Sequence, residues 1–261
     1  MKVIMLAAGV GQRLHGDDND HLPKALLRFG GKTLLARHME ILHGYGIEEM
    51  VIVVGYRKDM LLAEAAAVIE DIGLPENFVR SIFNPRYKES ALLSLGTADG
   101  ELRSGEDVIF MDADVLYHPE VMRRLIQSAH CNCFTMDREF EFGDEPVKIC
   151  LKGGELIDFG KAVTDDYEAI GEWPGFLKMS PEIAVKLADA VQGHIGTDDE
   201  FVAYEAAMRD VLVSEPAGTF NYEDITGIPW TEIDFPKDVV HAGQVVLPSM
   251  KRFDASAFEA E

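Results

Sequence analysis

Apolar residues in the first half of the chain follow two different periods. Short and almost uninterrupted apolar runs, typical of buried parallel strands, lie at Val3–Leu6, Met50–Val54, Phe78–Phe83 and Val108–Met111. The segments between them carry apolar residues three or four positions apart, which predicts helices over Thr33–His43, Asp59–Ile69 and Ser90–Leu102. In the first of these, His38 falls at the same helical spacing as the leucines. This alternation predicts an α/β layer structure with a mainly parallel sheet.

The pattern changes in the second half. Helices are expected over Glu120–His130, over Pro181–Val191 with Ser180 as its cap, and over Asp198–Leu212 with Thr197 or Asp198 as its cap. Strand-like runs lie at Cys133–Met136, Val147–Leu151 and Glu155–Phe159, and Gly153-Gly154 between the last two predicts a hairpin. Ile233–Val239 leads into a tail that we expect to be irregular. We therefore interpret the second half as antiparallel additions to a doubly wound first half.

No repeat, low-complexity linker or break in composition divides the sequence. We therefore predict one domain over residues 1–245, with halves at 1–115 and 116–245, followed by a C-terminal tail at 246–261. A chain of 261 residues with 47% hydrophobic content can fill the core that such a domain needs.

The charge of the chain narrows its range of partners. Its 24 Lys and Arg residues stand against 46 Asp and Glu, for a formal net charge of −22. Nucleic acids are bound through clusters of Lys and Arg, and anionic membrane surfaces attract such clusters, so we expect neither as a partner. Any anionic ligand must be held by a few local cations within an otherwise repelling surface.

The three cysteines, Cys131, Cys133 and Cys150, fit neither a disulfide framework nor a CxxC pair. We interpret them as small hydrophobic residues in a reducing compartment. No apolar stretch approaches the ~20 residues of a membrane span, and the apolar run in Met1–Gly9 is too short for a secretory signal. We therefore expect a soluble cytoplasmic protein.

A glycine-rich turn, Leu6–Leu14, begins at the end of the first predicted strand. Ligands of open α/β sheets bind at the carboxyl ends of the strands, and Gly9 and Gly11 let backbone N–H groups approach a phosphate closely. A dinucleotide-binding fingerprint is excluded because Leu14 stands where its third glycine is needed. A P-loop is excluded because Leu26 stands in place of a required glycine.

Two cations follow this turn. Arg13 lies two residues after Gly11, and Lys24 comes after the polar, acidic loop Gly16–His21. In a chain this acidic, the pair indicates a site for a polyphosphate. A solvated surface lysine is the alternative interpretation of Lys24.

Acidic residues mark two further positions. Asp112 and Asp114 follow the fourth predicted strand, and the alternation of side chains along a strand puts them on the same side. Carboxylate oxygens at this edge of a sheet suit Mg²⁺, whereas a helix cap is the alternative use of an Asp at such a turn. Asp234, within Trp230–Pro236, is a second acidic candidate.

The combination of Leu6–Leu14 with Pro23-Lys24-Ala25-Leu26 resembles the signature of nucleotidyltransferases, which join a nucleoside triphosphate to a sugar phosphate or similar acceptor. Further segments are similar to the phosphocholine cytidylyltransferase-like branch, which activates phosphocholine, aminoethylphosphonate and inositol phosphate with CTP. These segments are Gly55-Tyr56, Asn84-Pro85 through Ser90, Gly171-Glu172 with Gly175, and Glu232–Pro236. The resemblance spans Met1–Val240. It implies a Rossmann-like doubly wound mixed sheet of the nucleotidyltransferase (GT-A-like) type, with a nucleotide-binding half at 1–115 and an acceptor-binding half at 116–245.

The resemblance also implies roles for single residues. The nucleotide would be held by Leu6, Ala7, Ala8 and Gly9 around the base and ribose, by Gly11 under the triphosphate, and by Asn84 and Ser90 near the cytosine. Phosphates would be held by Arg13 and Lys24, and by Lys148, with Lys161 as a weaker candidate. Asp114 and Asp234 would bind Mg²⁺, and Asp112 would support them from behind. The loop Gly16–His21 departs from the family because it is unusually acidic.

The implied reaction transfers CMP from CTP to a phosphorylated or phosphonate small molecule and releases pyrophosphate. Glu172, Trp173 and the stretch Asp137–Glu145, which includes Phe140 and Phe142, would bind an amine or quaternary ammonium group of the acceptor; a solvated acidic hairpin is the alternative. A sugar-1-phosphate uridylyl- or guanylyltransferase and a non-catalytic nucleotide-binding relative are the alternative functions. The oligomeric state is open, with a homodimer among the alternatives.

Overall fold

The computed structural model describes the chain except for residues 17–19, 142, 144, 198–200 and 259–261. In this described part, a seven-stranded sheet has the order β13-β8-β12-β6-β1-β4-β5. Its parallel core is formed by β1 (Lys2–Ala7), β4 (Met50–Val54), β5 (Val79–Phe83) and β6 (Val108–Asp112). On the other side of β6 the sheet continues with β12 (Phe176–Met179), β8 (Cys133–Met136) and β13 (Asn221–Asp224). Antiparallel pairing of β12 with both β6 and β8 makes the sheet mixed.

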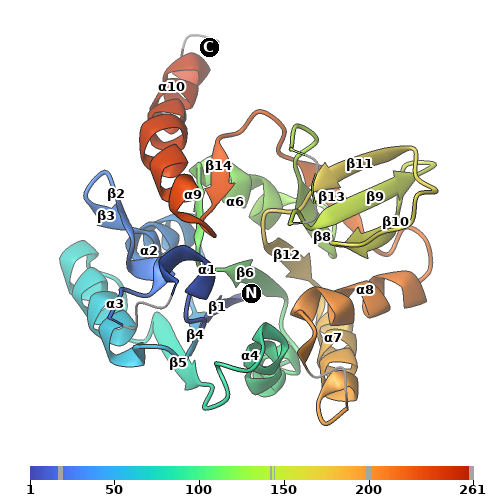
Figure 1. Cartoon of the computed structure of the whole chain (residues 1–261), viewed down its shortest axis with the longest axis horizontal. Helices are drawn as coiled ribbons and strands as arrows, with labels where there is room; N and C mark the ends of the chain where they lie inside the picture. Colours follow the sequence, from blue (N-terminus) through green and yellow to red (C-terminus); the bar gives the residue numbers. More distant parts are fainter. Residues whose placement is uncertain (17–19, 142, 144, 198–200, 259–261) are drawn as a thin grey trace.

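Both faces of this sheet are covered by helices (Figure 1). Val3 and Met5 of β1 pack into one hydrophobic cluster and Ile4 into the other, as expected for alternating side chains. The first cluster includes residues of α2 (Leu34–Gly44), α3 (Lys58–Ile72) and α6 (Pro119–Gln127). The second includes residues of α4 (Ala91–Thr97), α5 (Asp99–Leu102), α7 (Pro181–His194) and α8 (Tyr204–Ser214). The predicted doubly wound α/β fold is therefore confirmed.

Three small sheets accompany the large one in the described residues. In the first, β9 (Lys148–Lys152) lies between β10 (Glu155–Gly160) and β11 (Ala169–Glu172), all antiparallel. The predicted β9–β10 hairpin turns at Gly153 and Gly154, whose φ angles are +59° and +84°. The other two sheets pair β7 (Val115–Tyr117) with β14 (Trp230–Glu232), and β2 (Arg28–Phe29) with β3 (Lys32–Thr33). The antiparallel additions expected in the second half are thus present.

The C-terminal part corrects one prediction. Instead of an irregular tail, the chain forms α9 (Pro236–His241), a π-helical turn η3 (Ala242–Val246) and α10 (Leu247–Phe258), which projects from the body in Figure 1. Ala242, Val246 and Met250 bury against a third apolar cluster. The sequence did not predict this helical segment because Gly243 and Pro248, which lie within it, are poor helix formers. The boundary of the domain at residue 245 stays a prediction.

Several helix boundaries also differ from expectation: α6 ends at Gln127 instead of His130, and α7 extends beyond Val191 to His194. The segment Ser90–Leu102 divides at Ala98 into α4 and α5, and Ser90 is the N-cap of α4. Helix α8 begins later than expected, with Ala203 at its N-cap and no side-chain cap; the proposed cap Asp198 lies outside the described residues. No helix in the described ranges combines the length and apolar character needed to cross a bilayer.

Candidate active site

A cavity of about 420 Å³ opens where β1 and β6 end at their carboxyl ends. One wall comes from the turn after β1, together with the short helices α1 (Gln12–His15) and η1 (Lys24–Leu26). Other walls come from the connection between β11 and β12, from the start of α8 and from the end of β14. Of the sequence-predicted residues, those lining it are Leu6, Ala7, Ala8, Gly9, Gly11, Arg13, Lys24, Asp112, Asp114, Glu145, Lys161, Trp173 and Asp234. The fold therefore gathers positions more than 200 residues apart in the sequence.

The backbone of the glycine turn is fixed from both sides. Gly11 has a φ of +74°, and a Cβ at this position would lie 3.3 Å from Cγ of Lys24. The Ala8 carbonyl accepts a hydrogen bond from the backbone N–H of Tyr56 at 3.0 Å. Gly55 is required beneath it, because a Cβ there would lie 2.7 Å from the Ala8 oxygen. The turn is thus held in place while its inner face stays open to the cavity.

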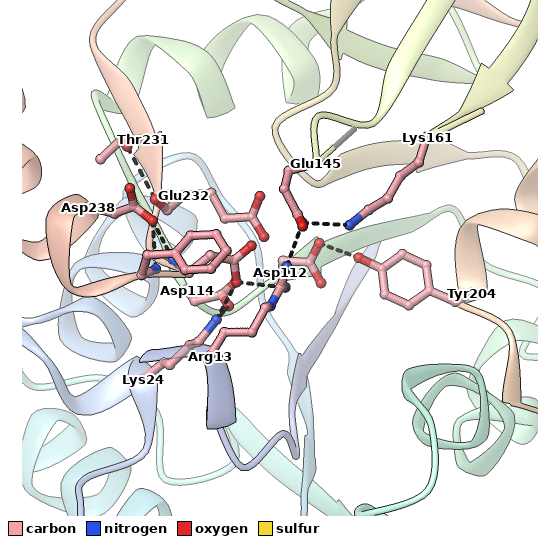
Figure 2. A network of polar contacts seen from close by, with 12 residues as sticks. Arg13, Lys24, Asp112, Asp114, Glu145, Lys161, Tyr204, Thr231, Glu232 and Asp238 are labelled. Carbon is pink, nitrogen blue, oxygen red and sulfur yellow. Dashed lines mark hydrogen bonds and ion pairs between the residues drawn. The ribbon is translucent and has the colours of Figure 1, made fainter. Parts of the chain in front are cut away.

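Lys24 lies at the centre of an ionic network (Figure 2). Its Nζ donates to Oδ2 of Asp114 at 2.8 Å and to Oδ1 of Asp234 at 2.7 Å. Arg13 donates to the same Asp234 oxygen at 2.9 Å and to Glu145 at 2.7 Å. Burial alone would lower the pKa of Lys24, but the charges of Asp114 and Asp234 outweigh it and raise the pKa above its ordinary value. The ammonium group therefore stays charged and ties the two carboxylates together.

Three carboxylates form a cluster around this cation. Asp114, Glu232 and Asp234 each offer one oxygen, and these oxygens all lie within 4.8 Å of one another. Desolvation of the carboxyl group, followed by the charges of Asp114 and Asp234, raises the pKa of Glu232 well above its ordinary range, although the residue as a whole is exposed. Hard oxygen donors at this spacing fit the ligand preference of Mg²⁺. Glu232 lies two residues before Asp234, within the segment Glu232–Pro236, but the sequence did not predict it as a metal ligand.

Asp112 occupies a different position. It lines the cavity, but its Oδ2 accepts a hydrogen bond from the Tyr204 hydroxyl at 2.5 Å, and it does not belong to the three-carboxylate cluster. A Cβ at Gly175 would approach that oxygen to 2.7 Å, so the glycine makes room for it. Burial, followed by the charge of Asp114, raises the pKa of Asp112. This arrangement agrees with a supporting role behind Asp114.

Lys148 is directed away from the cavity. Its Nζ donates to the carbonyls of Pro146 at 3.2 Å and Lys161 at 2.8 Å, and in the described structure it does not line the cavity. Lys161 does line it, and its Nζ lies 3.2 Å from Glu145. The register of β10 against β9 shifts between Leu156 and Asp158, and such a bulge re-aims the side chains that follow. The geometry therefore favours Lys161 over Lys148 for contact with a phosphate.

Three other sequence-predicted residues are also absent from the cavity lining in the described part of the chain. Asn84 is buried, and its amide donates at 3.0 Å to the hydroxyl of Ser94, a residue that does line the cavity. Ser90 caps α4, because its hydroxyl accepts from the Leu93 N–H at 3.2 Å. Glu172 lies opposite Lys148 in the β11–β9 ladder, and burial, followed by the nearby Asp137 charge, raises its pKa to about 7. These residues therefore border the cavity wall from behind.

The proposed cationic pocket is only partly described. Trp173 lines the cavity, but it is buried and its Nε1 donates to the Phe176 carbonyl at 2.8 Å. Asp137 accepts from Nε1 of Trp230 at 2.7 Å, and Phe142 lies outside the described residues. Tyr87, Tyr204 and Glu205 also line the cavity, and the sequence did not predict them because no local motif marks them. A cationic acceptor group stays a prediction.

Comparisons with known proteins identify the family of the chain. Residues 3–194 match the MobA-like NTP transferase domain family. The chain belongs to this family. It is 30% identical over 93% of its length to a bifunctional IPC transferase and DIPP synthase of Rubrobacter xylanophilus, and 26% identical over 91% to a CMP-5'-(3-aminopropyl)phosphonate synthase of Streptomyces rubellomurinus. It spans only 51% and 37% of the lengths of these two relatives.

The fold of this NTP transferase domain is also that of solved structures. The CTP:phosphocholine cytidylyltransferase of Streptococcus pneumoniae superposes with a TM-score of 0.72 at 21% identity, covering 94% of this chain and 98% of that one. Together, the family match and the relatives confirm the resemblance to nucleotidyltransferases, which was inferred from the glycine turn with Pro23-Lys24-Ala25-Leu26, and to their cytidylyltransferase-like branch, which was inferred from the further segments.

Proposed function

We propose that this NTP transferase domain transfers CMP from CTP to a small phosphorylated or phosphonate acceptor, with Mg²⁺ as its cofactor. The observation that carries the proposal is Lys24, which joins two acidic residues from distant segments, Asp114 and Asp234, beside the glycine turn. Cations and metal-binding carboxylates at one point are what phosphoryl transfer requires. The choice of CTP is supported by the names of the related cytidylyltransferases.

The chemistry needs no nucleophilic side chain. A phosphate monoester has a second pKa of about 6, so its oxygen is largely ionised at neutral pH and needs no general base. This oxygen attacks the α-phosphorus of CTP, the bond between the α-phosphorus and the bridging oxygen breaks, and pyrophosphate leaves with its electron pair. Arg13, Lys24 and Lys161 would bind and orient the phosphate oxygens. Mg²⁺ held by Asp114, Glu232 and Asp234 would neutralise charge on them.

A pyrophosphate-release assay tests this function. CTP, UTP, GTP and ATP are each combined with phosphocholine, 2-aminoethylphosphonate, inositol 1-phosphate and glucose 1-phosphate. We expect release with CTP and at least one of the first three acceptors. Release only with UTP or GTP and glucose 1-phosphate would establish the sugar-1-phosphate alternative. Tight CTP binding without release from any pair would establish a non-catalytic nucleotide-binding protein.

Variants test the residues. Asp114→Asn and Lys24→Ala should each lower turnover by ~10²-fold or more, because each removes a preorganised charge. The matched control is Asp71→Asn, an exposed carboxylate on α3 that does not line the cavity. Near-wild-type turnover in either site variant would contradict the assignment.

A second pair of variants separates the two lysines. Lys161→Met should raise the KM for the acceptor by ~10-fold or more, because a charge-assisted hydrogen bond to a phosphate is lost. Lys148→Met should lower the melting temperature, because the carbonyls of Pro146 and Lys161 lose their donor, but leave that KM unchanged. The reverse result would restore Lys148 to the phosphate site.

A further inference from the structure

His38 is a polar side chain on the buried face of α2. It is 0% exposed, and the other buried side chains of this helix are apolar: Leu34, Leu35, Ala36, Met39 and Leu42. Burial of a polar group is unfavourable unless its hydrogen-bonding atoms find partners. The partners of His38 therefore show what the residue does in this core.

Both ring nitrogens of His38 have partners on one segment. Nε2 lies 3.1 Å from the carbonyl oxygen of Ala113, and Nδ1 lies 3.3 Å from the hydroxyl of Tyr117. A carbonyl only accepts, so Nε2 carries the hydrogen and donates to Ala113, and Nδ1 accepts from the Tyr117 hydroxyl. Burial lowers the pKa of His38 to about 4, which agrees with this neutral imidazole. The Tyr117 ring stacks on the imidazole with centroids 5.4 Å apart.

This segment carries the first carboxylate of the cluster. Ala113 lies in the turn between β6 and β7, directly before Asp114. The Asp114 carbonyl accepts from the backbone N–H of Ile233 at 3.0 Å, between Glu232 and Asp234. Tyr117 pairs with Trp230 at the start of the β7–β14 ladder. His38 thus holds one end of the turn while β14, which leads to the other two carboxylates, holds its other side.

We propose that His38 is a positioning residue for the metal-binding cluster, because its hydrogen bond to Ala113 fixes the peptide group that orients Asp114. The inference rests on the proposed function only in assigning a divalent metal to Asp114, Glu232 and Asp234. Groups that orient metal ligands through hydrogen bonds typically contribute 10–100-fold to metal affinity. A histidine that only filled the core would contribute to stability but not to metal affinity.

Two substitutions at His38 differ in which partner the new side chain can reach. In His38→Gln the amide NH₂ takes roughly the place of Nε2 and keeps a donor for Ala113. In His38→Asn the shorter amide takes roughly the place of Nδ1, faces Tyr117 and leaves the Ala113 carbonyl without its donor. Met39→Ala is the matched control, because Met39 is equally buried on the same helix and belongs to the apolar core.

The readout is Mn²⁺ binding by the full chain, measured by titration calorimetry without nucleotide and again with CTP, beside thermal unfolding in a chelator. We expect His38→Asn to weaken Mn²⁺ binding by about 10-fold or more, and His38→Gln by less than about 3-fold. Met39→Ala should lower the melting temperature and leave Mn²⁺ affinity unchanged. Should His38→Asn fail to fold, His38→Leu takes its place, because it fills the apolar core without a donor for Ala113: it should weaken Mn²⁺ binding by about 10-fold or more, and unchanged affinity in it would overturn the proposal.

Other outcomes overturn the proposal. Equal Mn²⁺ affinity in wild type and His38→Asn, equal weakening in both His38 variants, or weakening in Met39→Ala would each show that His38 acts through packing alone. A wild-type chain that binds no Mn²⁺ with or without CTP would overturn the metal assignment and the positioning role together. A chain that binds Mn²⁺ with the expected pattern but releases no pyrophosphate with any substrate pair would refute the proposed function and leave the role of His38 standing.

Discussion

Replacement of Lys24 by methionine is the sharpest test of the ionic network. The substitution keeps the apolar stem and removes the ammonium group that joins Asp114 to Asp234. Removal of one partner from a fully buried ion pair costs about 3–5 kcal/mol. The three side chains are 15%, 21% and 12% exposed, so solvent screens part of the loss, and we expect about 2–3 kcal/mol. For a chain of this size that lowers the melting temperature by about 4–10 °C in the presence of a chelator.

A divalent cation should reverse much of this loss. In Lys24→Met the oxygens of Asp114, Glu232 and Asp234, within 4.8 Å of one another, lose the cation that compensates them. Mg²⁺ that binds the folded state stabilises it by mass action, and the variant, which has no ammonium group to displace, should bind the ion more tightly than wild type in the absence of nucleotide. Turnover should still fall by ~10²-fold, because Lys24 is also expected to contact phosphate.

The assay is thermal unfolding of wild type and variant, each in chelator and in excess Mg²⁺. The deficit of Lys24→Met should shrink when Mg²⁺ is present. The control is Lys32→Met, which removes an exposed ammonium 2.7 Å from Glu40 and should cost less than about 1 kcal/mol in both conditions. A Lys24→Met deficit of the same size in chelator and in Mg²⁺ would refute the reasoning that the metal and the lysine compensate the same carboxylates.

Three further variants test other parts of the structure. Burial raises the pKa of Glu172 to about 7, so between the unfolded and the folded pKa the folded chain holds a proton that the unfolded chain has lost, and the free energy of unfolding falls as the pH rises. Glu172→Gln should therefore gain about 1–2 kcal/mol relative to wild type between about pH 5 and pH 8. A pH-independent difference in melting temperature would contradict this. Gly55→Ala places a Cβ 2.7 Å from the Ala8 oxygen, so it should lower the free energy of unfolding by about 1–3 kcal/mol and raise the KM for CTP. An unchanged KM would show that the turn does not frame the nucleotide. Ser90→Ala and Ser180→Ala each remove an N-cap worth about 1 kcal/mol, and only the first should raise the KM for CTP; equal kinetics would remove Ser90 from the nucleotide site.

Most of the parallel core could be predicted from the sequence, because its information is local. Strand β4 is bounded as predicted, at Met50–Val54, since five consecutive apolar residues between a polar segment and Gly55 leave little choice of ends. The glycine turn and Asp114 follow strands of this kind, and the carboxyl ends of parallel strands meet at one edge of a sheet. Five residues singled out in the sequence are therefore close together in the structure: Gly11, Arg13, Lys24, Asp114 and Asp234.

What the sequence did not predict depends on distant partners. Strands β13 and β14 have four and three residues, none fully buried, so neither an apolar run nor an alternating pattern marks them. Pairing of β14 with β7 brings Glu232 to Asp114, and no local signal contains that pairing. The choice between Lys148 and Lys161 depended on which side chain reaches the cavity, and the backbone carbonyls that hold Lys148 elsewhere leave no mark in the sequence pattern.

The charge of the cavity has the same sign as the charge of the chain. Among the described residues that line it, six carboxylates stand against three cations: Asp112, Asp114, Glu145, Glu205, Glu232 and Asp234 against Arg13, Lys24 and Lys161. Walls of low dielectric strengthen the field of such a surplus rather than screen it. In the proposed reaction two polyanions meet here, and the bare site would repel them as they repel each other. The excess of carboxylates is therefore consistent with a reaction in which divalent cations arrive with the nucleotide. In such a reaction, affinity for the triphosphate depends on the same three carboxylates whose charge Lys24 compensates.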